Sequence, residues 1–197
     1  RYVVNVLDGE IGKALIDFLM NKKNQKINYG GQEALIYRVE MGQKSLRKLL
    51  HTVKGVKSWK VKFMTPASWN VMGTKGELRY PEPSYFLGNL SRLWNATAGK
   101  IESIPKDFYS WIEKYVFVSS YKLHTVAWDR GKPTKFVGCL GESTMGIIKS
   151  IKHGDQKDKE YSRWVEILLE FGRLSNVGKD RTAGFGRYKL KKNKPSP

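Results

Sequence analysis

Cysteine is almost absent from this sequence. Its 197 residues contain one, Cys139, which excludes an internal disulfide and a cysteine-ligated zinc site. Long apolar runs are lacking too, because charged residues interrupt stretches such as Ala14–Ile16 well short of the ~20 apolar residues that span a bilayer. No signal-peptide pattern is evident. These absences predict a cytoplasmic protein that has no membrane partner.

Acidic residues are scarce relative to basic ones. The chain has 36 Lys and Arg against 18 Asp and Glu, a formal net charge of +18. A fold does not need this imbalance, and self-repulsion opposes it, so a polyanionic partner would explain it. Nucleic acid is the first such partner, an anionic membrane surface is the second, and a solvated lysine coat is the alternative. With 40% hydrophobic and 12% aromatic residues, the composition is that of a globular protein with a core.

The first 55 residues form the first of two predicted regions. Strand patterns occupy Tyr2–Leu7 and Ala34–Met41, on either side of the Gly30-Gly31 turn and of a helix whose apolar residues recur at helical spacing from Ile11 to Leu19. A linker helix follows over Ser45–Val53. Strand, helix and strand make the second half of a ferredoxin-like domain, so we expect its first half upstream of the first residue.

Residues 56–192 form the second predicted region. Trp59–Met64 alternates strictly between apolar and charged residues, which indicates a half-buried strand that Thr65-Pro66 ends. A long loop, 66–83, precedes the later elements. We expect a helix around Phe86–Trp94, a hairpin of strands Tyr115–Trp128 and Thr134–Ile148 joined by Asp129–Pro133, a charged loop over Lys149–Lys159, a helix around Tyr161–Leu169 and a strand at Phe185–Leu190. This βαββαβ order predicts a ferredoxin-like domain, and the α+β class for the chain.

A glycine-rich basic segment, Gly178–Gly186, lies between the last predicted helix and strand. Glycines at 178, 184 and 186 permit positive φ, and successive N–H groups in such a loop can form an anion-binding nest. Lys179, Arg181 and Arg187 add positive charge for phosphate contacts. The alternative is a tight structural turn, since glycine is common where helices end.

This segment resembles the C-terminal signature of the RAMP superfamily of CRISPR-associated proteins, most closely the endoribonuclease that processes repeats. Further motifs in matching order carry the resemblance: Phe63-Met-Thr-Pro66, Pro81–Leu90 with Leu93-Trp-Asn95, Lys135-Phe-Val-Gly138, and Tyr2–Leu7, Ile11–Met20 and Ala34–Val39. The resemblance implies tandem ferredoxin-like domains, the first incomplete at its N-terminus. It also implies CRISPR repeat RNA and precursor CRISPR RNA as ligands, other CRISPR-associated interference subunits as partners, and RNA cleavage with neither metal nor cofactor.

Metal-independent RNA cleavage needs a deprotonated 2′-hydroxyl, a protonated leaving oxygen and a stabilised phosphorane charge, roles that His, Tyr and Lys suit. Strand alternation places His124 and Lys122 on one face, so His124 is the first catalytic candidate, Lys122 a charge stabiliser and His51 a weaker candidate. His153 lies in a charged loop. The resemblance implies a catalytic histidine in the first half of the first domain, which we expect outside this sequence. A polar surface role is the alternative for each histidine.

The basic residues on strands are expected to face RNA, because the helices of a βαββαβ domain cover only one side of its sheet. Lys60 and Lys62 lie on one strand, and Arg187, Lys189 and Lys191 on another. Loop cations Arg79, Lys132 and Lys135 add phosphate contacts. Trp69, Tyr80 and Trp128 lie in or beside loops, where they could stack on bases or pack the edge of the core.

Three functions therefore compete. The first is an endoribonuclease that cuts precursor CRISPR RNA at one site by 2′-hydroxyl attack. The second is a non-catalytic RAMP-type subunit that holds CRISPR RNA within an interference complex. The third is a general RNA-binding protein of the RRM type, although no K/R-G-F-G-F-V-x-F motif is evident on a central strand.

Overall fold

The computed structural model describes residues 4–7, 9–29, 31–42, 45–129, 134–148 and 156–191. The chain divides into two compact units, Arg1–Ser45 and Leu46–Pro197, and each is described by itself. Helix α2 (Leu46–Thr52), which the sequence assigned to the 1–55 region, packs in the second unit. Its Leu50 is buried in the core there, and Arg163 of helix α5 (Gln156–Ser175) donates two hydrogen bonds to the Leu50 carbonyl, at 3.2 and 2.6 Å.

The first unit consists of a helix and a hairpin. Helix α1 (Gly9–Asn21) is confirmed, whereas the two predicted strands are not. Residues 4–7 and 36–42 adopt no strand, and β2 (Gln32–Leu35) pairs with β1 (Lys26–Tyr29), which the sequence analysis missed. The left-handed backbone of Gly31, with φ of 82°, helps to explain the difference, because it lies where the chain turns back and an adjacent four-residue segment becomes the antiparallel partner of β2.

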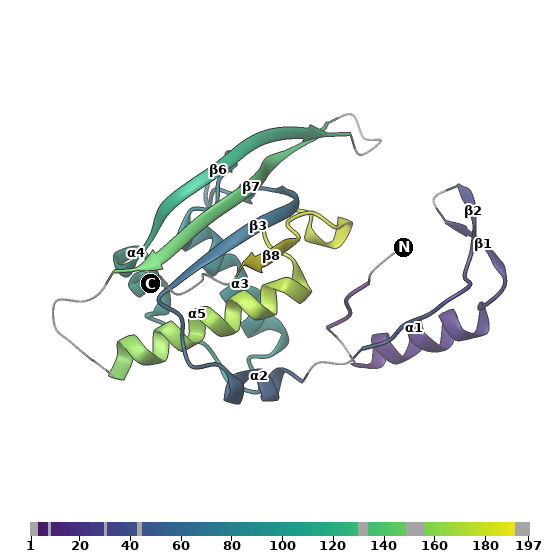
Figure 1. The fold of residues 1–197 in the computed structure, drawn as a ribbon, viewed down its shortest axis with the longest axis horizontal. Helices are drawn as coiled ribbons and strands as arrows, with labels where there is room; N and C mark the ends of the chain where they lie inside the picture. The colour runs from purple at the N-terminus through teal and green to yellow at the C-terminus, as the bar shows by residue number, and fades with distance from the viewer. Residues whose placement is uncertain are drawn as a thin grey trace. The chain divides into compact units, whose positions relative to one another are not determined.

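The second unit is built on a four-stranded antiparallel sheet (Figure 1). Its strands are β3 (Ser58–Ala67), β6 (Val116–Trp128), β7 (Phe136–Ile147) and β8 (Tyr188–Lys191), in the order β6-β7-β3-β8. Helices α3 (Pro83–Thr97) and α5 lie together on one face of this sheet. Order and connections are those of a ferredoxin-like domain, which confirms the predicted βαββαβ arrangement and the α+β class.

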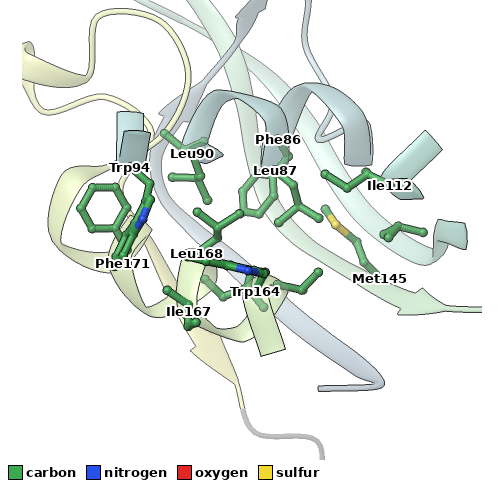
Figure 2. Packing of buried hydrophobic residues seen from close by; sticks show 14 of the residues in the cluster. Phe86, Leu87, Leu90, Trp94, Ile112, Met145, Trp164, Ile167, Leu168 and Phe171 are labelled. Carbon is green, nitrogen blue, oxygen red and sulfur yellow. The ribbon is translucent and has the colours of Figure 1, made fainter. Parts of the chain in front are cut away.

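Alternation along the strands fixes which face of the sheet is buried. On β3, Trp59, Val61 and Phe63 are buried against the helices, whereas Lys60 and Lys62 point to the other side. The helices contribute aromatic residues to this core (Figure 2), where the Trp94 ring centroid lies 5.8 Å from that of Trp164 and 5.2 Å from that of Phe171. The helix-free side of the sheet thereby carries the lysines of β3, and we call it the open face.

Strand β3 does not end at Thr65-Pro66 as predicted. It continues to Ala67 through an irregularity, since Phe63 pairs with Gly141 and Ala67 with Cys139, four residue steps on β3 against two on β7. Proline, which cannot donate a ladder hydrogen bond, is tolerated at such a bulge. Here the Pro66 carbonyl accepts a hydrogen bond from the N–H of Gly186 at 2.8 Å, so the bulge supports the glycine-rich segment.

Other boundaries differ from the predicted ones. The predicted 66–83 loop contains a small hairpin, β4 (Trp69–Asn70) with β5 (Glu77–Leu78). Helix α4 (Phe108–Tyr115) was missed because its eight residues adjoin β6 directly, so that Tyr115 was assigned to the strand. Helix α5 starts within the predicted charged loop at Gln156. Strand β8 starts at Tyr188 because the left-handed backbone of Gly186, with φ of 69°, interrupts the strand predicted from Phe185.

Candidate nucleic-acid interface

Lysine side chains form rows across the open face. One row crosses all four strands. Glu142 on β7 is paired with Lys122 on β6 and with Lys62 on β3, and Lys62 is paired in turn with Lys189 on β8. In the neighbouring row Lys60 is paired with Lys191. The four strands together carry five lysines and one glutamate, all within the described residues. We call Lys60, Lys62, Lys122, Lys189 and Lys191 the lysine array.

Glu142 lies among these ammonium groups. Its carboxylate is 3.5 Å from Nζ of Lys60 and 4.0 Å from Nζ of Lys62, and it accepts a hydrogen bond from Nζ of Lys191. That hydrogen bond, together with the positive charges of Lys191 and Lys60, lowers the pKa of Glu142 below its ordinary value. The lysine array and Glu142 together therefore carry a net charge of +4.

An aromatic residue that the sequence analysis overlooked lies on the same face. Phe117 of β6 is paired with Gly146 of β7, and its ring covers the position of a side chain there, since a Cβ on Gly146 would lie 3.2 Å from its Cζ. The Phe117 side chain is 40% exposed. Its position on an edge strand, opposite a glycine, was the signal available in the sequence.

The predicted stacking aromatics separate into two groups. Trp69 is only 2% exposed and packs edge-on against Phe63 and Phe86. Of the two roles open to it, base stacking and core packing, the structure therefore confirms core packing. Trp128, at the end of β6, is 58% exposed, and Tyr80 is 47% exposed. These two remain available for stacking.

Backbone N–H groups of the glycine-rich segment are used within the protein. Their acceptors are Asn89 Oδ1 for Gly178 (2.9 Å) and the carbonyls of Ser68 for Lys179 (2.8 Å), Asp180 for Ala183 (2.9 Å), Arg181 for Gly184 (3.1 Å) and Pro66 for Gly186 (2.8 Å). An N–H group that already donates cannot also hold a phosphate. The anion-binding nest predicted for this segment is therefore not formed by these five groups.

Two of the glycines are required by close backbone packing. Gly178 has φ of 84°, and a Cβ there would lie 2.4 Å from the Ser68 carbonyl oxygen. Gly186 has φ of 69°, and its Cβ would lie 1.7 Å from the Val177 carbonyl oxygen. Both positions combine a left-handed backbone with no room for a side chain.

The cations of the segment have different surroundings. Lys179 forms an ion pair with Glu77 of β5, whereas Arg181 lines a cavity of about 450 Å³ between α3 and the segment. Arg92 and Asp180 line it as well, along with Asn89, Leu93, Ala96, Gly178 and Thr182. Arg92 was not singled out in the sequence because it lies on the polar side of a predicted helix.

The other predicted RNA contacts are exposed where the structure describes them. Arg79, Arg187 and Lys135 all lie at the surface, and Arg187 directly precedes β8. Its carbonyl accepts hydrogen bonds from the N–H groups of Met64 and Thr65, at 2.8 and 3.4 Å, which joins it to the β3 bulge. Lys132 lies outside the described residues.

The histidines are not brought together. His124 is exposed on the open face. It lies two residues after Lys122 on β6, so both side chains are on the same face, as predicted. His51 is exposed near the end of α2, which packs on α5 and therefore belongs to the helix side of the sheet. His153 lies outside the described residues. His124 and Lys122 thus share one face of β6, whereas His51 lies on the helix side of the sheet.

Two further features concern the part of the chain that the structure describes. No three His, Cys, Asp or Glu side chains gather there in a way that could hold a metal ion. None of the described helices has the length and apolarity needed to cross a membrane.

The second unit is therefore a ferredoxin-like domain whose open face, the side of the sheet without helices, is basic. Solved structures share the fold. A Thermus thermophilus Cas6 (TTHB231) product complex matches with a TM-score of 0.79 at 17% identity, over 93% of this chain and 72% of that chain. A Cas6 (TTHA0078) product complex matches with a TM-score of 0.75 at 16% identity, over 92% of this chain and 73% of that one.

The family follows from the sequence itself. The pattern of the CRISPR-associated endoribonuclease Cas6 family matches residues 61–188, from β3 to the start of β8, so the chain belongs to that family. A partial Cas6-RT-Cas1–Cas2 complex also shares the fold, with a TM-score of 0.54 at 15% identity, over 98% of this chain and 34% of that one. A search of curated proteins gave no match.

Proposed function

We propose that this chain binds CRISPR repeat RNA on the open face and cleaves precursor CRISPR RNA at one position, by metal-independent attack of a 2′-hydroxyl. The observation that carries the proposal is the lysine array on the open face of a Cas6-family domain. Lysine ammonium groups neutralise phosphates, and that contribution dominates RNA affinity. Phe117 and Trp128 offer exposed rings on which unpaired bases stack.

His124 and Lys122 would perform the chemistry. His124 takes the proton of the 2′-hydroxyl, whose oxygen attacks the adjacent phosphorus and forms a 2′,3′-cyclic phosphate. The bond from phosphorus to the 5′-oxygen breaks, and that oxygen takes a proton from a solvent water molecule and leaves as a hydroxyl. Lys122, on the same strand face, stabilises the charge of the phosphorane.

Incubation of the protein with labelled repeat RNA in EDTA tests this function. We expect one cleavage product, with a rate unchanged by the chelator. His124→Ala should lower that rate about 10²- to 10⁴-fold, the usual contribution of a general base, while RNA binding is kept. His51→Ala, on the helix side, should leave it unchanged.

Two results would count against the proposal. Intact binding without any single-site product would remove the nuclease activity, and a His124→Ala variant as fast as the wild-type protein would place the base elsewhere. Loss of cleavage in EDTA that Mg²⁺ restores would replace the metal-independent step by a metal-assisted one.

The second function is a non-catalytic RNA-binding subunit, which the separation of His51 from His124 favours. It predicts binding without cleavage, and co-purification with other CRISPR-associated proteins, as in the Cas6-RT-Cas1–Cas2 assembly whose fold the chain shares. Competition by unrelated RNA as effective as that by repeat RNA would instead favour a general RRM-type RNA-binding protein.

A further inference from the structure

Glu142 is the one carboxylate among the residues of the four strands of the described sheet. It lies between Lys122 and Lys62 in its row, and it is also within 4.0 Å of the ammonium groups of Lys60 and Lys62. Lys191 donates a hydrogen bond to it. Three of the five array lysines therefore already share an anion that belongs to the protein.

A carboxylate oxygen and a phosphate oxygen are acceptors for the same ammonium groups. The carboxylate is ionised at neutral pH, since its lysine neighbours lower its pKa. The side chains involved are 27–48% exposed, so the ion pairs are solvated and weak enough to exchange. An RNA phosphate that approaches Lys60, Lys62 or Lys191 must displace Glu142 or share its partners.

We propose that Glu142 is a built-in competitor of RNA phosphate on the lysine array, which lowers the affinity of the open face for any RNA. The inference rests on the proposed function, because it assumes that RNA binds this face. The free energy lost when Glu142 is displaced then sets a threshold for RNA binding. A few phosphate contacts alone do not offset that loss, whereas an RNA that makes further contacts does offset it.

Glu142→Gln tests the competition, because it removes the charge and keeps the size of the side chain. Binding of labelled repeat RNA and of an unrelated single-stranded RNA of equal length is measured over a series of KCl concentrations. We expect both RNAs to bind about 2- to 5-fold more tightly at low salt, the range set by weak exposed ion pairs. The plot of log affinity against log salt should become steeper by about 0.7, one additional phosphate contact on a single strand.

Glu170→Gln is the matched control. Glu170 has a similar exposed fraction and an ion pair of its own, 2.7 Å from Arg173, but it lies on α5, on the covered side of the sheet. It changes the net charge of the protein by the same amount. We expect it to alter the affinity less than twofold, because its charge lies on the opposite side of the sheet from the lysine array and has no ion pair with it.

The double variant Lys60→Ala, Lys62→Ala separates this inference from the function beneath it. Weaker binding by the double variant together with wild-type or reduced affinity of Glu142→Gln would overturn the inference and keep the open face as the RNA site. If Glu142→Gln and the double variant both bind RNA with wild-type affinity, the inference is overturned, and so is the proposal that RNA binds the open face. The cleavage assay in EDTA still decides the nuclease activity.

Discussion

Phe117 lies next to the lysine array. It allows a direct test of whether base stacking contributes to the RNA affinity. Its neighbour across the strand pair is Gly146, so truncation removes an exposed ring without opening a large buried cavity. We expect Phe117→Ala to weaken binding of single-stranded repeat RNA by about 1–3 kcal/mol, the usual loss for one base–aromatic stack. Fluorescence anisotropy with labelled RNA measures it.

Phe117→Tyr serves as the control, because it keeps a ring that can stack. It should bind RNA as the wild-type protein does. If Phe117→Ala binds equally well too, the ring belongs to the packing of the sheet edge and has no part in RNA recognition.

Two glycines of the 178–186 segment offer a matched pair for stability. Gly184 and Gly186 both have positive φ, at 89° and 69°, but only a side chain on Gly186 meets backbone, 1.7 Å from Val177 O. We expect Gly184→Ala to cost about 1 kcal/mol of unfolding free energy, the strain of a left-handed alanine. Gly186→Ala should cost at least about 3 kcal/mol, as strain and displacement combine.

Urea unfolding followed by circular dichroism measures both free energies. Equal values for the two variants would contradict the packing role of Gly186. If Gly186→Ala were stable and bound RNA poorly, the segment would contact RNA through this glycine directly.

The four strands of the sheet act as one binding element if the lysine array holds phosphates. Replacement of Lys60, Lys62 and Lys189 by alanine removes three of its charges while leaving the catalytic candidate Lys122. We expect the salt dependence of RNA binding to fall by about 2 in slope, since each phosphate contact on a single strand contributes about 0.7.

Three exposed lysines outside the sheet provide a charge-matched control. Lys75 lies in the β4–β5 connection, and Lys100 and Lys106 lie between α3 and α4. Their replacement gives the same change in net charge, yet the salt slope should stay within about 0.5 of the wild-type value. A slope that falls equally in both triple variants would mean that RNA responds to overall charge and not to the array.

Elements with long, regular patterns were predictable from the sequence. The alternation of Trp59 to Phe63 and the apolar spacing of Tyr161 to Leu169 correctly fixed the orientation of β3 and the existence of α5, because each pattern reflects one buried face. Shorter elements were not. Helix α4 has only eight residues and packs on α5, where Trp111 donates a hydrogen bond to Asp158 at 2.9 Å. Hairpin β1–β2 has four residues in each strand, and so few residues leave little periodic pattern.

The candidate site shows the same division. Lys60, Lys62, Lys189 and His124 were placed correctly because alternation determines the side of a strand. The array as a unit could not be predicted, since it depends on a register that joins β6, β7, β3 and β8. The role of Glu142 depends on that register too, and the use of the loop N–H groups depends on where α3 and the β3 bulge lie.

The acid stability of the whole unit should depend on a cluster between α4 and α5. Asp107, just before α4, forms an ion pair with Lys157 and accepts a hydrogen bond from Tyr161, and these interactions lower its pKa. The folded protein then binds fewer protons than the unfolded chain near pH 4, so this stabilisation is present above the unfolded pKa and is lost as the pH falls through the folded one.

Asp107→Asn should therefore have a lower melting temperature than the wild-type protein at pH 7, and the difference should shrink below about pH 4, where the unfolded carboxyl is protonated. Thermal unfolding at several pH values checks this. A difference that stays constant down to pH 2.5 would show that the amide loses a hydrogen bond only, without a contribution from charge.

Strand β6 has one further consequence, for the handling of the protein. It is the end strand of the sheet and is thirteen residues long, and such an edge is a template for pairing with another copy. Lys122 near its centre and the net charge of +18 oppose that pairing. Concentrated salt, the usual means of stripping co-purified nucleic acid, screens the same repulsion, with a Debye length of about 3 Å at 1 M. During purification, high ionic strength is therefore needed to remove RNA, whereas low ionic strength is needed to prevent aggregation.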